Sequence, residues 1–362
     1  MGRILVEKDV EAAVKGGSVY AAGGGGWADH GRKLGYAAVG CGKPELVSID
    51  ELSDDAWVAT AAAIGAPAST TAWEMQGVDY VKAAQLLQHE LGEPLAGLII
   101  GQNGKSSTLN AWLPSAILGT KVVDAVGDIR AHPTGDMGSI GMAGSPVQMI
   151  QTAVGGNRAE NRYIELVVKG ATARISPVLR AASDQSGGFI ASCRNPLRAS
   201  YVRANAALGG ISMALSLGEA IIAAEKKGGH AVIDAICRTT NGEIIAEGVI
   251  GKKNVRYTKE AFDVGTVTVG NAGKSVTLHV MNEYMAVDDG ERRLATFPAV
   301  ITTLSPEGVP LSVGELREGM HVHVLHVPKT VIPLSASVLD PAVYPPVEAA
   351  MGIEIARYVF EK

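Results

Sequence analysis

The chain has 362 residues, of which 47% are hydrophobic, 19% are charged and 44 are glycine, and its net charge is −5. This composition supplies a packed interior and excludes a disordered chain, while the absence of any Lys/Arg run argues against a nucleic-acid partner. No apolar stretch reaches the roughly 18 residues of a membrane span, the N-terminal segment lacks the apolar region of a signal peptide, and the three separated cysteines indicate no disulfide framework, so we expect a cytoplasmic protein.

The first 230 residues alternate helical and strand patterns. Helices are expected at 9–19, 27–39 and 78–91, the last with an apolar face and Gly92 at its end. Short strands are expected at 45–49, 95–100 and 121–125. A helix at 109–118, which Pro114 should kink or shorten, separates the last two strands, and strand–helix–strand spacing predicts parallel pairing.

The middle of the chain contains a long segment without clear periodicity. Residues 126–160 are rich in Gly, Asp, Met and Asn, and a loop of this length in a compact protein is usually functional or disordered. A strand is expected at 162–169, followed by helices over 196–226 with a break at Gly209-Gly210.

After His230 the pattern changes to period two with frequent turn signals. Strands are expected at 264–269, 275–281 and 321–327, and a helix at 347–358. The predicted fold is therefore an α/β N-terminal part with a mainly parallel sheet, followed by a β-rich C-terminal domain. We expect domains at 1–230 and 231–345, closed by a C-terminal helix at 346–362.

Two glycine-rich segments could approach a ligand. Gly23–Gly26 follows a helix rather than a strand, so it fails the context of a dinucleotide-binding fingerprint. Its backbone, including Gly25 and Gly26, could instead form a nest of amide donors, or it could simply be a tight turn.

The second segment, 101–107, resembles a phosphate loop. The first glycine of that motif would fall at Ile99, which leaves nucleotide binding through Lys105 as a minor alternative. Because loops after parallel strands often bind ligands, Gln102, Asn103 and Ser106 are suited to orienting a polar heterocycle.

Charged residues gather just after the strand at 121–125. Asp124, Asp128, Arg130, His132 and Asp136 lie within thirteen residues. Carboxylates with an imidazole suit zinc or a similar divalent ion, and the same set could supply a general acid and base. The alternative is a polar loop whose charges pair with one another.

Two further signals lie in the β-rich part. His321 and His323 should point to one face of a strand, where packing is more common than metal binding. Asn282 and Glu283 interrupt an apolar strand pattern, which indicates either a bulge at a domain interface or a contact with the site.

The order of these motifs resembles the family named after S-methyl-thiohydantoin desulfurase. The resemblance rests on the following segments: Gly23–Gly26, Ile64-Gly65-Ala66-Pro67, Glu74, Gln102-Asn103, Val122-Val123-Asp124-Ala125, Arg130-Ala131-His132-Pro133 and Asn282-Glu283-Tyr284. It covers nearly the whole chain. It implies metal-dependent hydrolysis of a hydantoin-like ring and an α/β part followed by a β-rich part.

The sequence also departs from the family pattern. That pattern carries Glu-Ile-Gly-Gly before its asparagine and Ala-Asp-Gly-Met-Gly-Arg-Ala-Phe-Pro after its aspartate. Here the corresponding segments are 99–102 and 125–133, so one family acid is missing while Asp128 and His132 are gained. The chain therefore resembles a divergent subgroup.

The leading hypothesis is a metal-dependent hydrolase that opens a C–S or C–N bond of a small cyclic amide or thiohydantoin-like ring. The divalent ion, expected to be zinc, would generate hydroxide that adds to the ring carbon between the two nitrogens. The predicted metal ligands are Asp124, His132 and His30. Asp128 or Glu74 would act as acid or base. Gly25, Gly26, Gln102, Asn103, Ser106, Arg130 and Glu283 would bind the substrate.

The alternative hypothesis is a non-catalytic subunit that binds a hydantoinase-like or oxoprolinase-like partner. Small residues at Gly209, Gly210 and Gly218 also suit a homodimer.

Overall fold

A computed structural model describes residues 2–65, 75–271 and 273–361. The predicted catalytic Glu74 lies outside them. The helices are α1 (Glu7–Tyr20), α2 (Ala28–Cys41), α3 (Gly77–Leu91), α4 (Trp112–Leu118), α5 (Thr172–Gln185), α6 (Ala199–Asn205), α7 (Gly210–Glu225), α8 (Gly229–Thr240), α9 (Pro345–Met351) and α10 (Ala356–Phe360).

The strands fall into two sheets. Sheet A contains β1 (Arg3–Ile4), β2 (Glu45–Val47), β3 (Trp57–Gly65), β4 (Gly97–Gln102), β5 (Lys121–Asp128), β6 (Gln148–Gly155), β7 (Ile164–Ala171), β8 (Phe189–Arg198) and β9 (Ala207–Leu208). Sheet B contains β10 (Glu243–Tyr257), β11 (Asp263–Asn271), β12 (Lys274–Met281), β13 (Glu283–Asp288), β14 (Arg293–Thr296), β15 (Val300–Leu304), β16 (Pro310–Leu311) and β17 (His321–Val327).

Sheet A is mixed, with a parallel centre. Its order is β1-β2-β5-β4-β3-β8-β6-β7, and β9 pairs with β5. The pairs β2–β5, β5–β4 and β4–β3 are parallel, which confirms the pairing predicted from the strand–helix–strand spacing. The remaining pairs are antiparallel.

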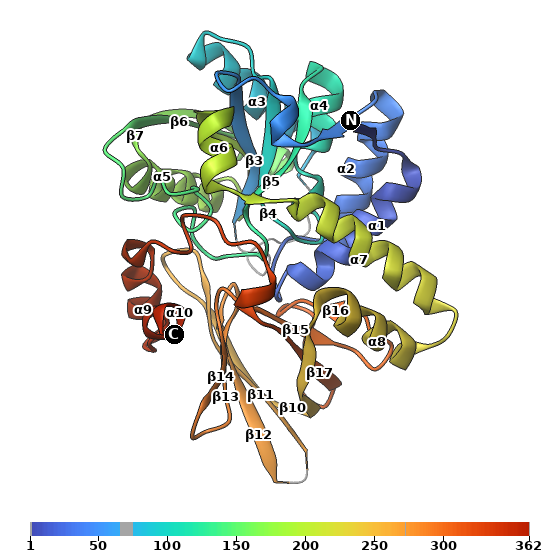
Figure 1. Ribbon diagram of the computed structural model, residues 1–362. Helices are drawn as coiled ribbons and strands as arrows, with labels where there is room; N and C mark the ends of the chain where they lie inside the picture. Colours follow the sequence, from blue (N-terminus) through green and yellow to red (C-terminus); the bar gives the residue numbers. More distant parts are fainter. Residues whose placement is uncertain (1, 66–74, 272, 362) are drawn as a thin grey trace.

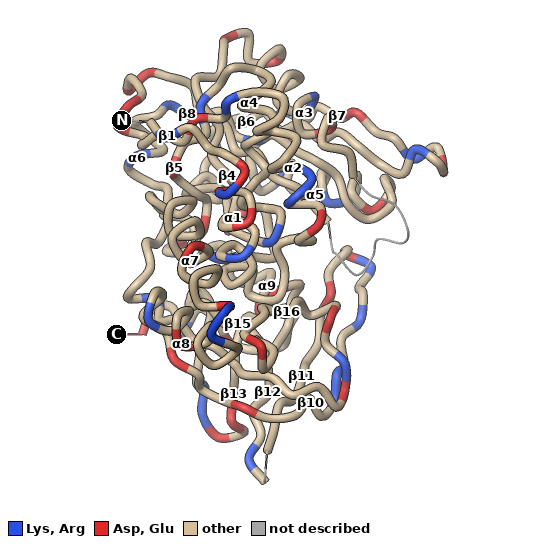
Figure 2. Tube along the Cα trace, turned by 90° about the vertical axis from the view of Figure 1, so that its right-hand side faces the viewer, with Lys and Arg blue, Asp and Glu red and all other residues tan. Residues whose placement is uncertain are grey.

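Sheet B is antiparallel throughout, in the order β14-β13-β12-β11-β10-β17-β15-β16. It extends away from sheet A and the helices around it, and α9 packs against β11 and β12 (Figure 1). The predicted fold class, an α/β part followed by a β-rich part, is therefore confirmed. Lys and Arg alternate with Asp and Glu along the trace (Figure 2). No helix in the described part of the chain has both the length and the apolar character needed to cross a membrane.

Three sequence-based expectations of secondary structure need correction. Residues 229–240 form α8 rather than β structure, because Val232, Ile233 and Ile236 lie on one buried face of a helix. The segment expected to be a loop at 126–160 contains the end of β5, at 126–128, and all of β6. The helix expected at 347–358 is split into α9 and α10, with left-handed Gly352 ending α9.

Helices α1 and α7 cross at closely packed glycines. A Cβ on Gly218 would lie 1.8 Å from the carbonyl oxygen of Ala12, and one on Gly16 would lie 1.8 Å from that of Ala214. Gly218, one of the small residues that suit a homodimer, packs here against α1 of the same chain. We expect Gly218→Ala to lower the free energy of unfolding by about 1–3 kcal/mol. The added methyl group would collide with the backbone of Ala12, which cannot rotate away as a side chain can.

The matched control for that prediction is Gly40→Ala in α2. No described atom lies within 4 Å of a Cβ at Gly40. This substitution should raise the free energy of unfolding by about 0.5–1 kcal/mol through helix propensity alone. Urea unfolding of both variants measures the difference, and equal effects would contradict the account of the crossing.

The two sheets are joined through the loop after α1. The backbone N–H of Tyr284 donates to the carbonyl of Ala22, and that of Val313 donates to the carbonyl of Gly23, at 2.8 and 2.9 Å. The Thr302 hydroxyl donates to the carbonyl of Val19 at 2.6 Å. These bonds hold β13 and β15 against the end of α1, and so place Glu283 beside the loops of sheet A.

Candidate functional site

A polar cavity of about 70 Å³ lies where loops of the α/β part meet the β12–β13 connection. The loop after α1, the end of β3, the loop after β5 and the elements α5 and β8 all contribute to its wall. The lining residues are Gly25, Gly26, Ala63, Ile64, Gly65, Gln102, Ser107, His132, Pro133, Thr134, Gly135, Ser176, Arg180, Phe189, Arg194, Asn282 and Glu283. Five residues expected at the site, Gly25, Gly26, Gln102, His132 and Glu283, are therefore brought together.

The glycines of the first loop leave room for the neighbouring side chains. A Cβ on Gly24 would lie 2.2 Å from Oε1 of Glu283, and one on Gly26 would lie 2.0 Å from the hydroxyl of Ser106. Gly25 packs with its backbone against Gly104 and has a φ of +74°, which favours glycine. The glycine loop thus makes close backbone approach possible on two sides, to the 101–107 loop and to Glu283.

Glu283 is a buried carboxyl group at the cavity wall. Asn282, with a φ of +56°, turns the chain between β12 and β13 and aims Glu283 back toward the α/β part. Burial raises the pKa of Glu283 to about 8, although the positive charges of Arg130 and Arg180 oppose the shift. Oε2 of Glu283 has no hydrogen-bond partner among the described residues. Glu283 therefore carries its proton at neutral pH and can donate it.

Two arginines that the sequence analysis did not select also line the cavity. Arg180 on α5 donates to the carbonyl of Pro133 at 2.9 Å and stacks over Phe262, whereas its Nη1 is buried without a partner in the described part of the chain. Arg194 on β8 is buried, and its Nε likewise lacks a described partner. Burial lowers the pKa of Arg180 to about 10, so its guanidinium stays charged at neutral pH. The cavity wall thus contains two buried guanidinium groups, each with one buried nitrogen that has no partner in the described part of the chain.

Asp136 provides the nearest compensation for one of these cations. Burial raises the pKa of Asp136, and the positive charge of Arg194 opposes that shift. A Cβ on Gly135 would lie 2.8 Å from Nη1 of Arg194, so the glycine gives the guanidinium its space. Asp136 belongs to the predicted charged cluster, and its carboxyl group interacts electrostatically with the guanidinium of Arg194.

His132 reaches the cavity from the loop after β5. Its Nδ1 lies 3.8 Å from Oδ2 of Asp128, a distance too long for a hydrogen bond. Burial lowers the pKa of His132, while the Asp128 carboxylate opposes the shift, so the imidazole is neutral at pH 7. Gln102 accepts a 3.0 Å hydrogen bond from the backbone N–H of His132, which fixes the orientation of the Gln102 amide. A neutral imidazole backed by a buried carboxylate can accept a proton from water.

Other predicted site residues lie outside the cavity lining and make structural contacts. The Asp124 carboxylate accepts the N–H groups of Ile211 and Ser212, at 2.9 and 3.1 Å, at the start of α7. His30 lies 3.4 Å from the hydroxyl of Tyr80. Asn103 donates to the carbonyls of Ile129 and Gly210, both at 3.0 Å. Ser106 is buried against Gly26.

Arg130 links the two parts of the molecule. Its side chain is fully buried and donates to the carbonyls of Ala131, Tyr284 and Ala299 at 2.8, 2.8 and 3.1 Å. The guanidinium also lies over the ring of Phe297, 5.1 Å from its centre. This residue therefore secures β13 against the loop after β5, and it acts on the cavity through the position of Glu283.

The resemblance of 101–107 to a phosphate loop is not matched by its geometry. Lys105 forms an ion pair with Glu315 instead of projecting over the loop. The N–H groups of Ser106 and Ser107 both donate to the carbonyl of Gly25, and that of Gly104 is directed at the hydroxyl of Thr108. These amide groups are thus committed to protein oxygens, so the geometry does not support the nucleotide alternative.

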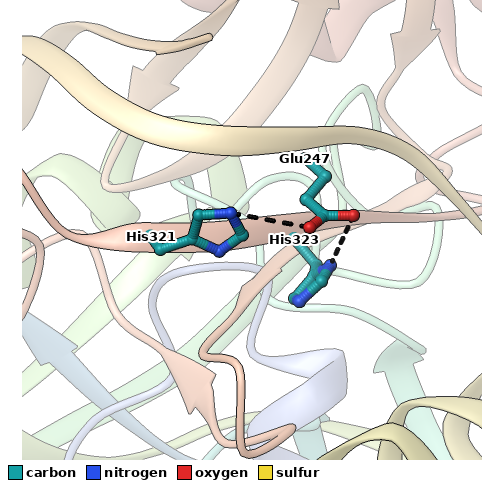
Figure 3. A group of neighbouring side chains, drawn as sticks. All are labelled: Glu247, His321 and His323. Carbon is teal, nitrogen blue, oxygen red and sulfur yellow. Dashed lines mark ion pairs between the residues drawn. The ribbon is translucent and has the colours of Figure 1, made fainter. Parts of the chain in front are cut away.

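A group of metal-binding type lies elsewhere. Within residues 2–65, 75–271 and 273–361, one set of three His, Cys, Asp or Glu side chains is close enough to hold an ion, namely Glu247, His321 and His323 on β10 and β17 (Figure 3). The expected ligands Asp124, His132 and His30 do not form such a set in this part of the chain. The described cavity lining does not fit a three-ligand metal site.

The comparisons with known proteins agree with this architecture. Residues 8–163 match the family model described as S-Me-THD-like, N-terminal domain, and residues 171–333 match the one described as S-Me-THD-like, C-terminal domain. The chain is also similar to a crystal structure of a protein from Chromobacterium violaceum, with a TM-score of 0.69, 24% identity and coverage of 91% of this chain and 92% of that one. At that identity the likeness shows the fold. No curated protein matches the sequence.

Proposed function

Because the chain belongs to the S-Me-THD-like family, we propose that it is a hydrolase that removes sulfur from a thiohydantoin-like ring bearing an acidic group, and that the reaction occurs in the cavity around Glu283. The observation that carries this proposal is a buried, protonated carboxyl group on the same cavity wall as two buried guanidinium groups, those of Arg180 and Arg194, each with one nitrogen that has no described partner. Buried groups whose pKa values are shifted in opposite directions are typical of active sites.

The two arginines explain the choice of an anionic ligand. Buried cations without full hydrogen bonding are costly, and an anion that takes up their free N–H groups offsets this cost. Since Glu283 is neutral and the charge of Asp136 offsets that of Arg194, the described lining retains the positive charge of Arg180 at pH 7. A carboxylate on the ring substituent, or an anion that develops during the reaction, neutralises this positive charge.

The reaction proposed for this site needs one water molecule. His132 accepts one proton of water as the water oxygen adds to the ring carbon between the two nitrogens, and the ring C=N bond becomes a single bond. The second water proton passes to that ring nitrogen as the adduct collapses to the carbonyl and the C–S bond breaks. Glu283 donates its proton to the departing sulfur, so an S-methylated ring yields methanethiol and the ring carbonyl. The proton taken up by His132 then returns to Glu283, which restores both groups. The side-chain amides of Gln102 and Asn282 line the same wall and suit the polar edge of the ring.

The metal dependence implied by the family resemblance is not part of this reaction scheme. The described lining residues do not supply three metal-binding side chains, so each step above uses groups of the chain itself. Metal content measured together with turnover, before and after treatment with a chelator, checks this. Turnover that persists in the stripped chain supports the acid–base scheme.

The acidic group of the substrate is tested by Arg194→Lys. Loss of the guanidinium fork should raise KM about 10- to 100-fold for a ring with a carboxylate side chain, corresponding to about 1.5–3 kcal/mol for charge-assisted hydrogen bonds. A ring with a neutral side chain should show little change. Steady-state kinetics on the two substrates measure the difference.

The control for this variant is Arg198→Lys, four residues further along the same strand. Arg198 stacks over Trp57 outside the cavity lining. Its replacement should leave KM for both rings unchanged. An equal effect of Arg194→Lys on acidic and neutral rings would rule out recognition of the anion.

A further inference from the structure

We propose that Glu247, His321 and His323 bind a divalent transition-metal ion of the zinc class, at a site separate from the cavity and independent of the function proposed for it. Glu247 lies on β10 and pairs directly across the ladder with His323 on β17. His321 lies two residues from His323, so both imidazoles project from the same face of the strand. Figure 3 shows the carboxylate of Glu247 between the two rings.

The separations match ligands of one ion better than hydrogen bonds. Nε2 of His321 lies 3.5 Å from one carboxylate oxygen of Glu247, and Nδ1 of His323 lies 3.6 Å from the other. Hydrogen bonds between such atoms span roughly 2.7–3.2 Å. Metal–ligand bonds of about 2.0–2.1 Å in tetrahedral geometry place two ligand atoms roughly 3.3 Å apart. All three ligand atoms already lie within 4.8 Å of one another.

The chemistry of the three donors selects the class of ion. Two imidazoles and one carboxylate suit zinc and the later first-row metals, whereas calcium and magnesium prefer oxygen ligands alone. Glu247 and His321 are exposed to solvent, which gives the ion access.

Another rung of the same ladder, three pairs away, provides a natural comparison. Glu243 pairs across the ladder with His326, and its carboxylate lies 3.6 Å from Nδ1 of that residue. This pair has one imidazole and one carboxylate at the same separation as the Glu247–His323 pair, and it lacks the second imidazole. Both rungs therefore contain a His–Glu ion pair, and they differ in the third ligand, His321, which is present at one rung only.

The test is zinc binding to the tag-free, full-length chain after chelator treatment. Isothermal titration calorimetry should give one zinc ion per chain at this site. Glu247→Gln and His321→Ala should each weaken its affinity at least about 100-fold, because loss of even an outer-shell partner costs roughly 10- to 100-fold. Both residues are exposed, so the variants should fold. Glu243→Gln and His326→Ala should bind zinc as the wild type does.

Two further readouts make the test independent of activity. Zinc should raise Tm of the wild type and of the Glu243→Gln variant but not of the Glu247→Gln variant. Cobalt should give the absorption of a low-coordinate site in the wild type but not in the Glu247→Gln variant. Undiminished zinc binding by Glu247→Gln and His321→Ala, equal losses at both rungs, or no binding by the wild type would overturn the proposal.

Discussion

The Glu283→Gln variant is expected to lose activity about 10²- to 10⁴-fold in kcat, the usual contribution of a positioned proton donor. The amide keeps the size of the carboxyl group but cannot protonate the departing sulfur. In the wild type, kcat should fall as pH rises through about 8, where Glu283 loses its proton. On the acid side it should fall below the ordinary pKa range of histidine, because burial lowers the pKa of His132.

The same substitution should make the chain more stable at alkaline pH. The pKa of Glu283 is raised from its ordinary 4.5 to about 8 in the folded chain, so folding binds a proton over that interval. The stability associated with the protonated group is fully present below about pH 4.5 and is lost progressively as pH rises to about 8. Glu283→Gln removes this loss, which is on the order of a few kcal/mol.

Urea unfolding at pH 5 and pH 8, with a kcat–pH profile, tests both consequences. The exposed Glu291, in the β13–β14 turn, gives the control Glu291→Gln, for which neither activity nor the pH dependence of stability should change. A Glu283→Gln variant with wild-type activity and the same alkaline limb would remove Glu283 from the reaction.

The Arg130→Ala variant is expected to lower the free energy of unfolding by about 3–5 kcal/mol. Three buried carbonyl groups, those of Ala131, Tyr284 and Ala299, lose their donor, and the space beside Phe297 is left empty. Arg130→Lys keeps the charge but cannot reach all three oxygens at once, so it should fall between the alanine variant and the wild type.

Thermal and urea unfolding measure this loss, and Arg238→Ala in α8, where the side chain is exposed, is the control. If Arg130 contacted substrate instead of joining the two parts, Arg130→Ala would change KM and leave stability near that of the wild type. That outcome would contradict the structural role assigned to the residue.

Helices and strands could be predicted from the sequence where the period of the apolar residues agrees with the position of glycine and other helix- or strand-ending residues. The helix expected at 78–91 is α3, ended by left-handed Gly92, and the strand expected at 321–327 coincides with β17. Parallel pairing of β4 with β5 followed from their spacing. By contrast, α8 follows Gly228-Gly229 and opens a region rich in turn signals, so its single apolar face was outweighed by the β pattern after it.

The candidate site could be predicted only in part, because sequence order does not give side-chain direction. Asp124 lies on β5 and His132 in the loop that follows it, yet Asp124 binds the start of α7 and His132 lines the cavity. Arg180 and Arg194 lie on α5 and β8, far in sequence from Glu283, and no local motif connects them. An arginine that directly follows the apolar and small residues of 189–193 is the signal that could have identified Arg194.

The metal-binding group shows the same limit. The spacing of His321 and His323 indicated a shared face, and packing was the favoured interpretation. Their third neighbour, Glu247, is set by the register of β10 against β17, which includes an irregularity between Ile244 and Ala246. That shift is a tertiary feature, because it depends on how two strands more than 70 residues apart align.

The most direct test of the proposed function is turnover of an S-methylated thiohydantoin that carries a carboxylate side chain, by the isolated chain in ¹⁸O-labelled water. We predict release of one methanethiol per ring and one ¹⁸O atom in the carbonyl between the two ring nitrogens, with both lost in Glu283→Gln. Absence of turnover by the isolated chain, or label found instead in the acid of a ring-opened product, would contradict it.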